Sequence, residues 1–221
     1  MKTNKAKGKV KNEKPSLLLF AICILQFAIL FSGCGAVGEI QAGRVDLLYG
    51  DPNKALAHFQ RAAELNPDYL YFSGMFPEGV MTYVGRAYYA AGKLPEARQA
   101  LERSAARHDR DYLARLYLGL VLARDGDRPR GLKEIESGIR GLHDWLEDVV
   151  YNTRYGKYWD PGREIRFAME KTLAMISSKE MDWSKVIAGA ESIGKQMEEE
   201  IDRAQKDERD DFFRDGAGKE P

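Results

Sequence analysis

The fold is decided by the stretch GRAYYAAGKLPEARQALERSAARHDRDYLARLYLGLVLARDG, which runs from Gly85 to Gly126. It is bounded by two pairs of glycines, each seven residues apart, at positions 85 and 92 and at positions 119 and 126, so the pattern recurs after 34 residues. An earlier pair, Gly43 and Gly50, begins 42 residues before Gly85, which implies an insertion of eight residues. The second glycine of each pair suits the left-handed turn that ends a helix, where a Cβ would be strained. The repeat therefore predicts successive pairs of antiparallel helices.

The second helix of each predicted pair carries an apolar stripe. Over residues 52–65 the stripe consists of Ala55, Phe59, Ala62 and Leu65, at the spacing of one helix face. A single hairpin is too small to bury such a stripe, so neighbouring hairpins must stack. Because no segment of useful length alternates between apolar and polar residues, the expected fold class is all-α.

The 34-residue period and its landmarks resemble the tetratricopeptide repeat family. The resemblance covers three units, at about 36–69, 78–111 and 112–145, and the first unit has Gly43, Gly50, Ala55, Phe59, Ala62 and Pro67 at the family's positions. The chain departs from the pattern where Asp109 replaces the closing proline of the second unit, and where Gly131 and Gly138 replace the two alanines of the third. The resemblance implies an α-solenoid of stacked helical hairpins.

In the resembled family, the first helices of the hairpins line a concave groove that binds a protein or peptide. Carried across, this implies a partner-binding groove formed by Arg44, Leu47, Thr82, Arg86, Tyr89, Leu116, Leu120 and Arg124. Arginine and tyrosine suit an acidic or aromatic segment, through charge-assisted hydrogen bonds and stacking. The alternative is that these residues form an ordinary solvated face. The family's carboxylate clamp is not supported, because Ile40, Arg44 and Thr82 stand where it uses lysine and asparagine.

The insertion, Leu70–Pro77 (LYFSGMFP), concentrates apolar residues in what we expect to be a loop. Either it packs as a flap onto the first hairpin, or it is exposed as a contact patch for a partner or a lipid surface. Residues 141–158 fit a degenerate fourth unit, and a further helix over 161–176 begins with Asp160 as its cap and Pro161 in its first turn.

The last predicted helix begins after Asp182 and carries a near-heptad apolar stripe: Trp183, Val186, Ala190, Ile193, Met197, Ile201 and Ala204. It suits the outer helix that caps a stack of repeats, so residues 146–205 are interpreted as a capping extension. The alternative is a helix that pairs with a partner or with its own copy. Residues 206–221 are acidic and are expected to be disordered.

Residues 1–33 have the layout of an export signal, since six lysines precede the apolar segment 17–31 (LLLFAICILQFAILF). The sequence Phe31-Ser32-Gly33-Cys34 resembles the lipobox of bacterial lipoproteins, in which the cysteine is lipidated and the chain is cleaved before it. The resemblance implies lipidation of Cys34 and a chain held on a bacterial membrane, facing the periplasm or the exterior. Because Gly35 is not acidic, the outer membrane is favoured. An uncleaved anchor and a soluble secreted protein are the alternatives.

The rest of the sequence offers no catalytic motif and no metal-ligand spacing, because its histidines, His58, His108 and His143, stand singly. No cofactor is expected. The 34 basic residues balance the 34 acidic ones, so no basic surplus indicates nucleic acid. We expect a membrane-anchored adaptor or scaffold that binds a protein partner and is not an enzyme. The alternatives are a structural accessory subunit of an envelope assembly or secretion complex, and an enzyme with an unrecognised site in residues 142–205.

Overall fold

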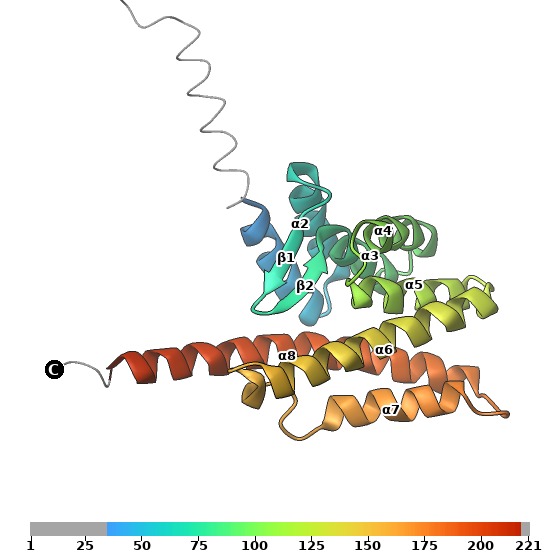
Figure 1. The fold of residues 1–221 in the computed structure, drawn as a ribbon. Helices are drawn as coiled ribbons and strands as arrows, with labels where there is room; N and C mark the ends of the chain where they lie inside the picture. Colours follow the sequence, from blue (N-terminus) through green and yellow to red (C-terminus); the bar gives the residue numbers. More distant parts are fainter. Residues whose placement is uncertain (1–34, 218–221) are drawn as a thin grey trace, which may run out of the picture.

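The computed structural model describes residues 35–217 and is mostly helical, as expected (Figure 1). Residues 35–48 are helical and are followed by α2 (Pro52–Leu65), β1 (Leu70–Ser73), β2 (Phe76–Gly79), α3 (Val80–Ala90), α4 (Leu94–Arg107), α5 (Tyr112–Arg124), α6 (Arg128–Asn152), the 3₁₀ helix η1 (Gly156–Tyr158), α7 (Glu164–Ile176) and α8 (Trp183–Ala217). The predicted export signal and Cys34 lie outside the described residues. Among the helices of 35–217, none combines the length and apolarity that a bilayer crossing requires.

Three helical hairpins follow one another: helix 35–48 with α2, α3 with α4, and α5 with α6. In each hairpin a glycine of the first helix packs against a residue of the second helix sixteen positions later. The three crossings are Gly43 with Phe59, Gly85 with Leu101, and Gly119 with Ile135. A Cβ on any of these glycines would lie under 3.0 Å from its partner, so each crossing needs glycine. The three hairpins therefore share one packing geometry.

The turns between the paired helices also correspond. Gly50, Gly92 and Gly126 have φ angles of 81°, 74° and 98°, in the left-handed region that disfavours a side chain. Open space surrounds each of them, so the backbone conformation and not crowding requires glycine there. After the first turn, Asp51 caps α2 by accepting a hydrogen bond from the Lys54 amide, and Pro52 fits the first turn of the helix.

The hairpins pack against their neighbours, since α2 contacts α3 and α4 contacts α5. Two apolar clusters result. The first lies between helix 35–48, α2 and α3 and includes Ile40, Phe59 and Tyr83. The second is centred on α5 and extends into α6, α7 and α8.

The insertion after α2 is not a loop but a two-stranded antiparallel hairpin, in which Leu70 pairs with Gly79 and Ser73 with Phe76. Its sequence is too short for alternation to be recognised, yet one face is buried: Tyr71 and Phe76 point inward while Phe72 is exposed. The turn between the strands, at Gly74, reaches the side chain of Gln205 on α8. The strands therefore bridge the first hairpin and the last helix (Figure 1).

The boundary predicted at residue 145 and the degenerate fourth unit are wrong, because α6 continues without a break to Asn152. The helix predicted over 161–176 begins at Glu164 instead. Asp160 nevertheless caps it from a distance, with a buried carboxylate that accepts hydrogen bonds from the amides of Ile165 (3.0 Å) and Arg166 (3.1 Å).

The apolar stripe of α8 is confirmed as a packing surface. All its members from Val186 to Ala204 have no exposed surface, and Trp183 packs at its edge. The helix does not end near residue 205 but continues to Ala217, so the prediction of a disordered tail is wrong for residues 206–217. Figure 1 shows α8 running below the hairpins and extending past them at its C-terminal end.

Candidate functional site

The face on which the partner groove was predicted is covered by α8. Arg44, from helix 35–48, is buried and binds two acids of α8, with its Nε 2.5 Å from Glu198 and its Nη2 2.7 Å from Asp202. Arg86, from α3, donates to the other oxygen of Glu198 at 2.7 Å. One carboxylate of α8 therefore joins the first helices of two hairpins.

The electrostatics of this cluster favour the charged form of Glu198 and disfavour the charged form of Glu78. Burial opposes ionisation of Glu198, but Arg86 and Arg44 outweigh it and lower the pKa of Glu198. Arg86 also donates to Glu78 of β2 at 2.7 Å, and burial raises the pKa of Glu78 to about 7 although Arg86 opposes the shift. The Arg86 guanidinium lies between the rings of Tyr83 and Tyr117, 5.7 and 5.3 Å from their centroids. A planar cation is stabilised in this position.

A second contact lies about two helical turns before Glu198 on α8, at Glu191. Glu191 accepts hydrogen bonds from the Tyr89 hydroxyl and from Arg124, at the ends of α3 and α5. Arg124 also stacks on the Tyr89 ring, 4.6 Å from its centroid. Burial and the bond to Glu191 raise the pKa of Tyr89, so the hydroxyl stays protonated and donates.

Three of the predicted groove residues do not face the groove. Leu116 and Leu120 are fully buried in the core around α5. Thr82 is buried too, and its hydroxyl donates to Asp111 at 2.6 Å, where α3, α4 and α5 meet. The expectation of an open groove is therefore corrected: Arg44, Arg86, Tyr89 and Arg124 are brought together, but by a helix of the same chain.

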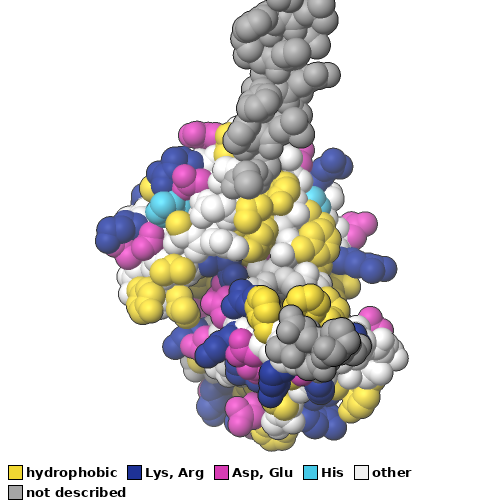
Figure 2. All heavy atoms as spheres, turned by 90° about the vertical axis from the view of Figure 1, so that its left-hand side faces the viewer, with side chains coloured by type: hydrophobic (Ala, Val, Ile, Leu, Met, Phe, Trp, Pro, Cys, Tyr) yellow, Lys and Arg dark blue, Asp and Glu magenta, His cyan; other side chains and the backbone are white. Residues whose placement is uncertain are grey.

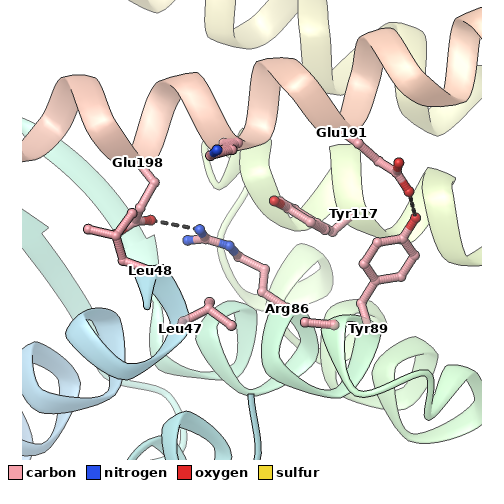
Figure 3. Close-up of a pocket in the computed structure, with 9 residues that line it drawn as sticks. Leu47, Leu48, Arg86, Tyr89, Tyr117, Glu191 and Glu198 are labelled. Carbon is pink, nitrogen blue, oxygen red and sulfur yellow. Dashed lines mark hydrogen bonds and ion pairs between the residues drawn. The ribbon is translucent and has the colours of Figure 1, made fainter. Parts of the chain in front are cut away.

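Closure by α8 leaves a pocket of about 280 Å³, shown in Figure 3. Its walls come from helix 35–48, α3, α5 and α8, and its lining residues are Leu47, Leu48, Arg86, Tyr89, Ala90, Tyr117, Glu191, Lys195 and Glu198. Of the predicted groove residues that line the pocket, Leu47 is the one that does not bind an acidic residue of α8. The pocket is mainly apolar and includes charged groups from α3 and α8.

The acids of α8 that complete the site were missed from the sequence. A signal was present: Glu191, Glu198 and Asp202 recur at intervals of seven and four residues, beside the apolar stripe and on one side of a helix. Their number matches the arginines Arg44, Arg86 and Arg124. Within residues 35–217 no group of acidic, histidine or cysteine side chains has an arrangement that would hold a metal ion.

Apolar side chains are also exposed at the end of helix 35–48. Val45, Leu48 and the turn residue Tyr49 are 52%, 45% and 84% exposed, and of these Leu48 also lines the pocket. Figure 2 shows hydrophobic patches on the face to the left of Figure 1, among mixed acidic and basic side chains. The surface therefore has no single-sign charge field on this side.

No family model, no curated protein and no solved structure matches the chain.

Proposed function

We propose that the chain is a tetratricopeptide-like adaptor, tethered to a bacterial membrane by a lipid on Cys34, that holds a protein partner at the cell envelope. The observation that carries the proposal is the packing geometry common to the three hairpins. Each crossing uses a glycine and a partner sixteen residues later, and each turn uses a glycine with positive φ. Such a repeat makes a rigid stack that presents surface for recognition.

The proposed partner surface is the exposed end of helix 35–48 and not the groove. Leu48 and Tyr49 follow Val45 by three and four residues, so the three side chains lie on one side of the helix end. Large exposed apolar residues grouped in this way mark contact sites. Cys34 directly precedes this helix in the sequence. A helix of fourteen residues is about 21 Å long, so the tether and the contact surface lie at opposite ends of one rigid element.

The tether is tested by mass spectrometry of the mature N-terminus, with Cys34→Ala as the control. A lipid-modified Cys34 is expected, and an unmodified or uncleaved N-terminus would contradict the tether. The mass distinguishes a lipoprotein from an uncleaved anchor and from a secreted protein.

The partner surface is tested by crosslinking in intact cells followed by affinity purification. The double variant Leu48→Ser with Tyr49→Ser is expected to lose a partner that the wild type captures. The control variant Phe167→Ser removes another exposed aromatic ring, 64% exposed, from α7 and should still capture the partner. Identical capture by both variants would remove helix 35–48 from the proposal.

A further inference from the structure

The hydrogen-bond pattern of the β1–β2 hairpin shows which backbone groups point away from it. The Val80 amide donates to the Tyr69 carbonyl at 2.9 Å, and these two residues continue the register of the strands. Because hydrogen-bonded pairs alternate with non-hydrogen-bonded pairs along an antiparallel ladder, the backbone groups of Tyr71 also point toward β2. Those of Leu70 and Phe72 therefore point outward, along the free edge of β1.

The outer edge of β2 is closed to a further strand. Pro77 lies on it and has no N–H to donate, which is a common way of protecting a sheet edge. The amide of Gly79, next along this edge, already donates to the buried carboxylate of Asp111 at 2.8 Å. The two edges of the hairpin are therefore not equivalent.

The edge of β1 is open by the same criterion. Within residues 35–217, the outward amide and carbonyl groups of Leu70 and Phe72 form no hydrogen bond. The two residues lie about 6.8 Å apart along the strand, and the Phe72 ring beside them is 58% exposed. A helix uses its backbone groups internally, so the partner that matches two donors and two acceptors at this spacing is an extended strand.

The surroundings of this edge favour a single extended segment. The turn at Gly74 reaches Gln205 and Glu208 of α8, and α8 then continues past the hairpin on the β1 side (Figure 1). Phe212, which is 68% exposed, follows Glu208 by four residues and so lies on the same side of α8. A second copy of the chain would have to fit its own helices around this projecting end, whereas an extended segment needs only the strip beside β1. The exposed rings of Phe72 and Phe212 select apolar side chains.

We propose that β1 binds an extended segment of a partner protein as a third strand of the sheet, with backbone hydrogen bonds to Leu70 and Phe72 and apolar side chains at alternate positions against the Phe72 ring. This inference goes beyond the adaptor proposal, because it uses a surface separate from the end of helix 35–48 and does not depend on a lipid at Cys34. A result against either surface leaves the other unaffected.

The test uses the isotope-labelled full chain and a synthetic peptide of alternating threonine and valine between terminal lysines (KTVTVTVK). The control peptide, KTPTPTPK, has the same length and charge but lacks the amide donors of the valines. NMR follows each amide as peptide is added to millimolar concentration, since so short a contact is weak. The amides of Leu70 and Phe72 are expected to shift and to exchange more slowly with solvent, while the amide of Tyr71, already bonded to β2, changes little. No response at Leu70 and Phe72, or an equal response to both peptides, would overturn the proposal.

Two variants at one position separate the backbone from the ring. Phe72→Pro removes the outward N–H but no hydrogen bond to β2, and the opposite residue, Pro77, shows that the ladder accepts proline at such a position. It should weaken binding about ten-fold or more. Phe72→Thr keeps the N–H and removes the ring, so a loss of about two- to five-fold is expected.

The Tyr71 amide serves as an internal control, because its unchanged protection from exchange shows that the hairpin is folded in each variant. Equal binding by wild type and a folded Phe72→Pro variant would contradict the assigned edge. Should the proline variant not fold, the wild type with the two peptides and Phe72→Thr still decide the matter. If the Leu70 and Phe72 amides of the peptide-free chain become protected as the protein concentration rises, a second copy occupies the edge and the proposal is wrong.

Discussion

The closure of the groove depends on Glu198, and replacing it tests whether α8 is an integral part of the fold. Glu198→Gln keeps the volume of the side chain and one oxygen acceptor but removes the charge. Arg44 is then left with Asp202, whose side chain is half exposed, and Arg86 is left with Glu78. Both guanidiniums remain buried, so the fold retains the cost of removing them from water without the carboxylate that offsets it.

The expected loss is large for a substitution of equal size. Removing one partner of a buried ion pair costs about 3–5 kcal/mol, and a hydrogen bond to a charged group contributes about 1.5–3 kcal/mol. Because glutamine still accepts from one arginine, we expect a loss of about 3 kcal/mol. With a urea m-value of about 2 kcal/mol per M, the unfolding midpoint should fall by about 1.5 M.

The assay is urea unfolding followed by circular dichroism at 222 nm. Glu199→Gln is a matched control, since Glu199 is the next residue on α8, is half exposed and pairs loosely with Lys195. It should change the unfolding free energy by less than about 0.5 kcal/mol. Equal midpoints for the two variants would refute the argument, because the ion pairs would then contribute nothing to the seating of α8.

Three further perturbations test other parts of the structure. Gly119→Ala should destabilise the fold by about 1–3 kcal/mol, because its Cβ would lie 2.5 Å from the backbone nitrogen of Ile135. Gly38→Ala, with open space around it, should be neutral or stabilising. Thermal unfolding compares the two variants, and similar midpoints would refute the shared crossing geometry. Folding raises the pKa of Glu78 from 4.5 to about 7, so the folded state binds this proton more tightly than the unfolded state does. The stability of the wild type relative to Glu78→Gln should therefore fall by about 3 kcal/mol as the pH rises from 4.5 to 7, and then level off. A stability difference that does not depend on pH would refute this expectation. Asp111→Ala removes a buried carboxylate that accepts hydrogen bonds from the amides of Gly79 and Ala114 and from the hydroxyls of Thr82 and Ser104. The free energy of unfolding, measured with a denaturant, should fall by about 3 kcal/mol or more. A decrease below about 1 kcal/mol would contradict the view that Asp111 holds α3, α4 and α5 together.

The local features of the hairpins could be predicted because each depends on short-range chemistry. Gly50, Gly92 and Gly126 are required by the backbone conformation of one residue, and the caps at Asp51 and Asp182 act on amides two or three positions away. The apolar stripe of α8 was visible for the same reason, since helical spacing alone places its members on one side. Helix ends were harder: α6 continues through the boundary expected at residue 145, because its buried residues Leu146 and Val149 extend the same face.

The candidate site was predicted in part. The sequence identified Arg44, Arg86, Tyr89 and Arg124 through their positions in the repeat, but it assigned them to a partner outside the chain. Their actual partners on α8 lie between 67 and 158 residues away along the chain. Nothing local distinguishes an arginine that awaits a ligand from one that a distant helix neutralises.

The sequence by itself therefore determined a mostly helical chain with glycine-turned hairpins, together with the amphipathic helix that follows them, since period, turn and stripe are properties of neighbouring residues. Only the tertiary structure decided where that last helix lies. Its apolar stripe must be buried somewhere, and the surface that accepts it also offers three arginines to its acids, so the groove is filled from within and a small apolar pocket remains.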